Sequence, residues 1–375
     1  MGTRILQVAN FYSRHSGGLR TTVDALGRAY TEGGYERVLV VPGAADADED
    51  TPAGRRITLR SPVLPGTGGY RALPGTTGVR AVLAELPPDH LEVSDKLTLV
   101  GLGAWAARNG LRAVLVSHER LDAILAPRVP PGFPLAACAD WWNRRIARSF
   151  DVVVTPSAFA AAEFTRIGAA NNSVVPLGVD LDVFHPRARD RSADANRHDN
   201  DKRLVCIGRL SREKRPDVAI ETLRAARARG LAARLWMVGD GPRRGALEAQ
   251  ARDLPVVFTG HLHDRGELAR LLAHADAALA PCPYETFGLA ALEALACGTP
   301  VVATDRGAVA ELVQAGQGAA AGAVAALTPS SLAAAIVDVV QRPRDECRRA
   351  ARARAEQYPW ARTAREVLRV HRGAT

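Results

Sequence analysis

The sequence predicts an α/β protein of two doubly wound domains, and three observations carry that prediction. Its 375 residues exceed what one hydrophobic core usually holds. Short β-branched runs alternate with longer Ala/Leu/Arg-rich stretches, which is typical of parallel strands joined by crossover helices. A polar segment over 187–202 separates two such series. We therefore expect an N-terminal domain over 1–186, a linker over 187–202 and a C-terminal domain over 203–356, with the two domains facing each other across a cleft.

Ten strands are expected, five in each domain. In the first domain they are predicted over 5–9, 37–41, 91–93, 113–116 and 151–155. In the second they are predicted over 204–207, 234–238, 256–259, 277–280 and 301–303. Ligands of doubly wound sheets bind outside the carboxyl ends of the strands. The turns that follow these strands are therefore the places where a site is expected.

The composition is that of an ordinary globular protein, with 47% hydrophobic and 24% charged residues. The sequence has no apolar run of about 18 residues, so no membrane-spanning helix is expected. Residues 1–20 lack the basic start, apolar middle and small-residue cleavage site of a secretion signal. A cytoplasmic location is the resulting expectation.

Charge and cysteine content exclude two further classes of site. The net charge is +9, and 46 of the 49 cations are arginine; the three lysines are Lys96, Lys202 and Lys214. No recognition helix, zinc finger or RNP-like aromatic pattern accompanies this charge, so we expect no nucleic-acid partner. The five cysteines are odd in number and form no CxxC pair. We expect them to be small buried residues rather than metal ligands or disulfides.

The strongest indication of a site is the segment 285–293, which follows the predicted strand 277–280. A helix is expected to begin near Thr286 and to end at Gly298. The amides of Phe287, Gly288 and Leu289 would then be unpaired at the positive end of the helix dipole. Such a helix start is a favourable place for an anion.

Two carboxylates belong to the same segment. Glu285 lies at the helix start, and Glu293 lies about 9 Å along the axis from Phe287 at roughly 1.5 Å per residue. Because a carboxylate beside a diphosphate would repel it, we expect both to bind hydroxyls, of a sugar at one end and of a ribose at the other. The alternative is plain helix electrostatics with a solvated mid-helix glutamate.

A second motif follows the strand 204–207. Arg209 and Lys214 lie in one strand-to-helix loop, and the next helix is expected to begin at Pro216. A guanidinium fork and an ammonium together suit a departing diphosphate. The alternative is a solvated run of surface charge. The sequence contains neither GxGxxG nor GxxxxGK[ST], so a simple dinucleotide or P-loop site is not predicted.

Together these motifs resemble a known family. Gly208-Arg209, Glu213-Lys214, Gly239-Asp240-Gly241-Pro242 and the Glu285-x7-Glu293 pair are similar to the nucleotide-sugar half of retaining glycosyltransferases of family 4. The resemblance covers the whole chain and implies a GT-B fold, in which a C-terminal helix, here over 357–375, crosses back to the first domain. Segments 16–22, 92–95 and 117–122 look most like actinobacterial phosphatidylinositol mannoside α-mannosyltransferases.

The resemblance implies a role for each candidate residue. Arg209 and Lys214 would neutralise the diphosphate, helped by the amides of 287–289, while Glu293 would hold the ribose and Glu285 the hexose. Base recognition would use the backbone near His261 and Leu262. In the first domain, His118 would touch the donor sugar, and Gly17 and Gly18 would let a backbone amide approach the phosphates. The first-domain alternatives are a purely structural histidine and glycines that only turn the chain.

The function implied is retaining transfer of a hexose, mannose from GDP-mannose, to a hydroxyl of an inositol-containing lipid or related polyol, without a metal cofactor. A lipid acceptor implies peripheral contact with an anionic membrane, for which the loops 60–80 and 126–135 are candidates. Alternatives are a soluble natural-product or inositol-phosphate acceptor with a UDP- or GDP-sugar, and a non-catalytic two-lobed binding protein. We favour front-face attack because no nucleophilic carboxylate can be named near the anomeric carbon.

Overall fold

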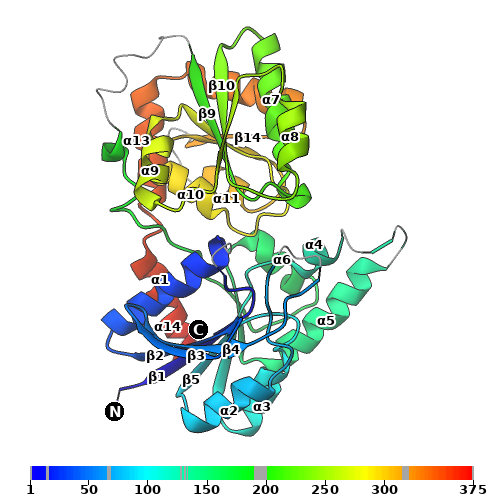
Figure 1. Ribbon diagram of the computed structural model, residues 1–375, viewed down its shortest axis with the longest axis vertical. Coiled ribbons are helices and arrows are strands. Elements are labelled where there is room, and N and C mark those ends of the chain that lie inside the picture. Colours follow the sequence, from blue (N-terminus) through cyan, green and yellow to red (C-terminus); the bar gives the residue numbers. More distant parts are fainter. Residues whose placement is uncertain are drawn as a thin grey trace. The chain divides into compact units, whose positions relative to one another are not determined.

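The computed structural model describes residues 2–13, 17–65, 69–126, 129–130, 132, 134–189, 201–314 and 321–373. Packing divides the chain into two units (Figure 1). Unit 1 comprises Met1–Gly178 and Trp360–Thr375, and unit 2 comprises Val179–Pro359. Residues 190–200, which make up most of the predicted linker, lie outside the described residues.

Unit 1 is built on an eight-stranded sheet of order β3-β4-β2-β1-β5-β6-β7-β8. All neighbouring strands are parallel except β3 and β4. The strands are β1 (Arg4–Ala9), β2 (Glu36–Gly43), β3 (Ala47–Thr51), β4 (Gly54–Arg60), β5 (His90–Ser94), β6 (Arg112–Val116), β7 (Val152–Thr155) and β8 (Asn172–Val174). The strand order reverses between β1 and β5, so the loops after these two strands diverge at the point where such folds bind ligands.

Helices cover both faces of this sheet (Figure 1). They are α1 (Gly18–Glu32), α2 (Thr77–Glu85), α3 (Gly101–Arg108), α4 (Leu121–Leu125), α5 (Leu135–Ser149), α6 (Ala158–Thr165) and α14 (Trp360–His371). Side chains alternate along β1, so Leu6 and Val8 face the core shared with α2, α3, α5 and α6. Ile5 faces the opposite core, which α1 and α14 cover.

The hairpin of β3 and β4 was not predicted. β3 has no apolar alternation, and that of β4 is limited to Ile57 and Leu59. Charged pairs join the two strands: Arg55 Nη2 lies 2.6 Å from Asp48 Oδ2, and Arg56 Nη2 lies 2.7 Å from Glu49 Oε2. Opposite charges across an antiparallel pair stabilise it modestly. Two further strands, β8 and β14, were also missed; both are short.

Unit 2 carries a parallel six-stranded sheet of order β11-β10-β9-β12-β13-β14. Its strands are β9 (Lys202–Ile207), β10 (Ala233–Val238), β11 (Val256–Gly260), β12 (Ala277–Ala280), β13 (Val301–Thr304) and β14 (Gly322–Ala325). Its helices are α7 (Pro216–Ala228), α8 (Arg244–Gln250), α9 (Arg265–His274), α10 (Leu289–Ala296), α11 (Val309–Gln314), α12 (Pro329–Gln341) and α13 (Arg344–Ala355). The order reverses between β9 and β12, which makes the loops after these two strands the expected site.

The predicted α/β class with two doubly wound sheets is confirmed, and every one of the ten predicted strands is present. In unit 2, α7, α8 and α12 contribute to the core on one face of the sheet. On the other side α10 packs against α9 and α13, as Figure 1 also shows. Among the described residues, no helix combines the length and apolar character needed to cross a membrane.

Candidate active site

The site in unit 2 is centred on an ion pair between two predicted residues. Lys214 follows β9 and Glu285 follows β12, the two strands between which the order reverses. The Lys214 Nζ atom donates a hydrogen bond to Glu285 Oε2 at 2.8 Å. Their side chains are 35% and 27% exposed, so the pair is formed but open to a ligand. The structure thus brings together a cation and a carboxylate that are 71 positions apart in the chain.

The loop that carries Lys214 is held from within. Lys214 ends a 3₁₀ turn, and Arg215 after it has a left-handed backbone with a φ of 53°. Pro216 then opens α7, as predicted. The Sγ atom of Cys282 contacts the carbonyl oxygen of Glu213 at 3.4 Å. A non-glycine residue with positive φ is strained by about 1 kcal/mol, and strain of this kind clusters at functional sites.

Glycines of the motif 239–242 allow two loops to pack backbone to backbone. A Cβ atom at Gly239 would lie 2.1 Å from the carbonyl oxygen of Gly208, and one at Gly241 would lie 2.6 Å from that of Leu210. The Leu210 amide donates to the Asp240 carbonyl oxygen at 3.0 Å. Arg209, between these contacts, has an exposed side chain. The loop that presents Arg209 is therefore fixed by the loop after β10.

The expected start of α10 near Thr286 is wrong. The helix begins at Leu289, and Gly288 caps it with a φ of 98°. The backbone amides of the first turn belong to Leu289, Ala290 and Ala291, and no hydrogen-bond partner for them occurs among the described residues. Phe287 and Gly288 lie just before this turn, and the Phe287 side chain is buried against Tyr358 with ring centroids 6.1 Å apart. The first-turn amides, predicted at 287–289, therefore lie two residues further along the chain, at 289–291.

Glu293 lies one turn further along α10 and is mostly buried, with 15% of its side chain exposed. Its Oε1 atom is 3.9 Å from Arg265 Nη2. Burial raises the pKa of Glu293 to about 7, against the opposing charge of Arg265. The carboxyl group therefore titrates near neutrality. Leu262, predicted near the base, is partly exposed on the loop after the edge strand β11.

His118 and the glycines 17 and 18 lie at the carboxyl edge of the sheet in unit 1. The His118 Nε2 atom is 2.9 Å from Ser94 Oγ, at the end of the neighbouring strand β5. Burial lowers the pKa of His118 to about 4, so the ring is neutral at pH 7. Gly17 caps α1 and Gly18 begins it. A Cβ atom at Gly17 would meet nothing within 4 Å, so packing inside the described structure does not demand glycine there.

No motif in the sequence marks the residues around His118. Ser94 was part of a quoted segment, but nothing marked it as the partner of the ring. Lys96 donates a hydrogen bond to the carbonyl oxygen of Glu119, the residue after His118. The only feature of the sequence that could have drawn attention to Lys96 is the rarity of lysine, with three lysines among 49 cationic residues.

Several other expectations concern residues around the site. In the part of the chain that the structure describes, no group of three or more His, Cys, Asp or Glu side chains could hold a metal ion. Four cysteines are buried as expected, whereas Cys138 is exposed. Parts of the two loops suggested for membrane contact, residues 66–68, 127–128, 131 and 133, lie outside the described residues.

Comparison with known proteins assigns the family. A family model described as "Glycosyl transferases group 1" matches residues 201–342, and one described as "Glycosyl transferase 4-like domain" matches residues 17–180. The chain is similar along 97% of its length, and 95% of the relative's, to a GDP-mannose-dependent alpha-(1-6)-phosphatidylinositol dimannoside mannosyltransferase of Mycobacterium tuberculosis, at 48% identity. It belongs to the family 4 glycosyltransferases.

Two further likenesses are informative about this glycosyltransferase. A GDP-mannose-dependent alpha-(1-6)-phosphatidylinositol monomannoside mannosyltransferase of M. tuberculosis is 29% identical, with 83% of each chain covered. The structure of sucrose-phosphate synthase from Thermosynechococcus elongatus superposes with a TM-score of 0.79 at 22% identity, covering 99% of this chain and 98% of that one. At this identity the structural likeness shows the fold alone. The predicted family and the GT-B fold are confirmed, and the binding-protein alternative is not favoured.

Proposed function

We propose that this glycosyltransferase moves mannose from GDP-mannose to phosphatidylinositol dimannoside. The observation that carries the proposal is the 48% identity, over nearly the whole of both chains, to the enzyme named for that donor and acceptor. Identity to the enzyme named for the monomannoside is only 29%. We therefore propose the acceptor with two mannoses rather than the acceptor with one.

The geometry of unit 2 supports an activated sugar held by its diphosphate. Lys214 and Arg209 bring positive charge to the loop after β9, and the amides at the start of α10 face the same switch point from the loop after β12. The pair with Glu285 fixes the Lys214 ammonium. The second carboxylate oxygen of Glu285 can then accept hydrogen bonds from hexose hydroxyls. Glu293 accepts hydrogen bonds from the ribose hydroxyls, and the backbone of the loop around Leu262 contacts the base.

We propose a front-face reaction with retention and without a metal. The bond between the anomeric carbon and the phosphate oxygen breaks, and a bond from the acceptor oxygen forms on the same face of the sugar. The acceptor hydroxyl proton moves to the departing phosphate oxygen. Arg209 and Lys214 stabilise the charge that develops on the diphosphate, as a divalent ion does in other transferases. A neutral His118 orients the sugar rather than transferring a proton.

A lipid acceptor places the enzyme at a membrane surface. The net charge of +9 favours an anionic surface such as the inner face of the plasma membrane. We propose that the protein is cytoplasmic and binds this surface peripherally through the loops 60–80 and 126–135. Arg60, Arg71 and Tyr70 are described residues of the first loop.

The test is transfer of radiolabelled mannose to a panel of acceptors. GDP-mannose or UDP-glucose is supplied with phosphatidylinositol monomannoside, phosphatidylinositol dimannoside or inositol phosphate, and product and anomeric configuration are read by mass spectrometry and NMR. We expect GDP-mannose with the dimannoside to give an α-linked product at a rate at least tenfold above the other combinations. A preference for inositol phosphate or for UDP-glucose contradicts the proposal.

A further inference from the structure

A buried polar cluster lies directly beside His118, and from it we infer that Lys96 is a positioning residue for His118 in glycosyl transfer. The inference rests on the role of His118 in the proposed function. On this proposal the Lys96 side chain acts on His118 and not on the substrate. Its effect is carried by the loop between β6 and α4.

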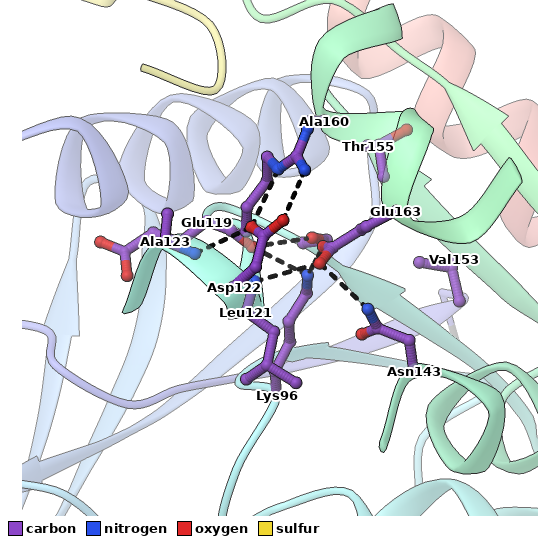
Figure 2. Close-up of polar contacts among 12 residues, drawn as sticks. Lys96, Glu119, Leu121, Asp122, Ala123, Asn143, Val153, Thr155, Ala160 and Glu163 are labelled. Carbon is purple, nitrogen blue, oxygen red and sulfur yellow. Dashed lines mark hydrogen bonds and ion pairs between the residues drawn. The ribbon is translucent and has the colours of Figure 1, made fainter. Parts of the chain in front are cut away.

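The centre of the cluster is an ion pair between Lys96, two residues after β5, and Glu163 of α6 (Figure 2). Their side chains are 6% and 0% exposed. The Glu163 carboxylate also accepts from the Leu121 amide and from Asn143 Nδ2, both at 3.0 Å. Four parts of unit 1 therefore meet at one buried carboxylate: the segment after β5, the start of α4, α5 and α6.

The same lysine holds the backbone next to His118. Lys96 Nζ donates to the carbonyl oxygen of Glu119 at 2.8 Å, as Figure 2 shows. On the other side of His118, the Ser117 amide donates to the Val154 carbonyl oxygen at 2.8 Å. The ring itself meets Ser94 Oγ at 2.9 Å. The last residue of β5, Ser94, thus contacts the His118 ring, and Lys96, two residues later, holds the main chain one residue after His118.

The rest of the loop is anchored to α6 as well. Arg120 pairs with Asp122, with Nη2 and Oδ2 2.6 Å apart, and its Nη1 atom donates to the Phe159 carbonyl oxygen at 3.0 Å. The Leu121 amide donates to the Glu163 carboxylate, so each of residues 119–121 has a polar contact to a neighbouring element. A loop held at consecutive residues keeps His118 in one place.

Stability alone does not explain why this site is charged. Buried ion pairs are commonly no more stabilising than apolar side chains of the same volume. An apolar pair, however, could bond neither the Glu119 carbonyl nor the Leu121 amide. The site also needs lysine in a chain with 46 arginines, because a compact ammonium contacts Glu163, the Glu119 carbonyl and the face of Phe164, 4.9 Å from its ring centroid. The nearby Lys96 charge also helps to lower the pKa of His118.

The experiment removes both charges together, so that neither is left buried alone. In the full-length enzyme, the double variant Lys96→Met/Glu163→Gln is assayed with GDP-mannose and phosphatidylinositol dimannoside, and GDP binding is measured by calorimetry. We expect kcat to fall at least tenfold while the Kd for GDP stays within twofold, because the residues proposed to bind the nucleotide belong to unit 2, except Gly17 and Gly18, which follow another strand of unit 1, β1. Leu39→Val, in a separate part of the unit 1 core, is the control for a loss of stability.

A cycle with His118→Ala separates the inference from the proposed function. We expect His118→Ala to lower kcat, and the Lys96/Glu163 changes to add less than twofold to that loss. Full additivity, or wild-type kcat in Lys96→Met/Glu163→Gln, overturns the positioning role alone. Wild-type kcat in His118→Ala instead contradicts the role of His118 in the proposed function.

A milder variant covers the case in which the double variant does not fold. Lys96→Arg keeps the charge but replaces the compact ammonium, so we expect a fall in kcat at unchanged GDP affinity and a shifted imidazole resonance of His118 in NMR spectra. An unchanged resonance together with wild-type kcat overturns the inference.

Discussion

Lys214 and Glu285 meet because β9 and β12 are neighbours in the sheet, although the two residues are far apart in the sequence. Each fixes the other at the carboxyl edge, and the ammonium stays accessible. If Lys214 is removed, an unpaired carboxylate remains next to the proposed diphosphate position. The loss therefore combines a missing positive charge with a new repulsion, and both act on the charge that develops during transfer.

Lys214→Ala is expected to lower kcat by about 100-fold, the effect typical of removing one electrostatic contact to a transition state. Because exposed ion pairs contribute about 1 kcal/mol or less, its free energy of unfolding should change little. Steady-state kinetics and urea unfolding measure the two quantities. Lys202→Ala is the matched control, and equal kinetics in both variants would remove Lys214 from the site.

Glu293 gives stability a pH dependence of defined sign. Its pKa is raised from 4.5 to about 7 in the folded protein, so folding favours the protonated carboxyl group. The stability that the protonated Glu293 contributes is therefore lost as pH rises through 7, where the buried group ionises. Glu293→Gln should therefore unfold at about the same urea concentration as wild type near pH 4.5, and be more stable by about 1–3 kcal/mol at pH 8. An equal difference in unfolding free energy between Glu293→Gln and wild type at the two pH values would contradict the raised pKa of Glu293.

Gly288 shows what the turn before α10 requires. It has a left-handed backbone, and a Cβ atom there would lie 2.6 Å from Val309 Cγ2. The carbonyl oxygen of Glu285, in the same turn, accepts from the Ala308 amide at 2.8 Å. These constraints hold residues 285–288 outside the helix and set its first turn at Leu289.

Gly288→Ala should cost about 2 kcal/mol or more of unfolding free energy, from backbone strain plus the contact with Val309. Adding Val309→Ala should recover the part due to the contact and leave the strain. Urea unfolding of the single and double variants separates the two parts. Gly245→Ala, in α8 with nothing within 4 Å of the added Cβ, is the control and should be neutral or stabilising.

The elements differ in how far sequence alone could predict them. Strands such as β1 and β9 are β-branched runs between helical stretches, and their order follows from the parallel alternation. β3 carries no apolar pattern and is joined to β4 by cross-strand charges, the alternation of β4 is limited to Ile57 and Leu59, and β14 is a run of only four small residues. The start of α10 was misplaced because Glu-Thr is typical of a helix start, whereas the left-handed Gly288 and the Glu285–Ala308 hydrogen bond decide it in three dimensions.

Site residues show the same division. Arg209, Lys214, Glu285 and Glu293 could be predicted because they belong to short motifs after strands that are adjacent at the switch point. The Lys96–Glu163 pair could not be predicted, because a buried contact across 67 positions leaves no spacing in the sequence. Burial also sets the pKa values of His118 and Glu293, and burial is a property of packing rather than of motif.

At the scale of the whole molecule, unit 1 is built from both ends of the chain. Helix α14 packs there: Val367 and Val370 share a core with Ile5, and Thr363 Oγ1 donates to the Pro176 carbonyl oxygen at 2.9 Å. At its end, His371 Nε2 lies 3.3 Å from Glu92 Oε2.

The polar interior beneath α14 depends on that helix. Glu92, in the middle of β5, is almost fully buried and also accepts from Gln7 Nε2 at 2.6 Å and from the Tyr30 hydroxyl at 2.8 Å. Loss of α14 would therefore expose an apolar face and remove one partner of a buried carboxylate, and both changes are costly.

A chain ending at Pro359 should lose stability in unit 1 and keep it in unit 2. Hydrogen exchange followed by mass spectrometry should show faster exchange in β1 and β6, with β9 and β12 unchanged. Arg369→Ala, on the exposed side of α14, is the control and should exchange like wild type. Undiminished protection of β1 in the shortened chain would show that α14 is dispensable.

The position of α14 also sets an order of events during translation. Residues 179–359 leave the ribosome as one continuous stretch and can fold as soon as they emerge. The earlier-made sheet must wait for the final segment before Ile5, Leu26 and Val114 are covered. The half of the protein that is synthesised first is thus the half whose core is completed last.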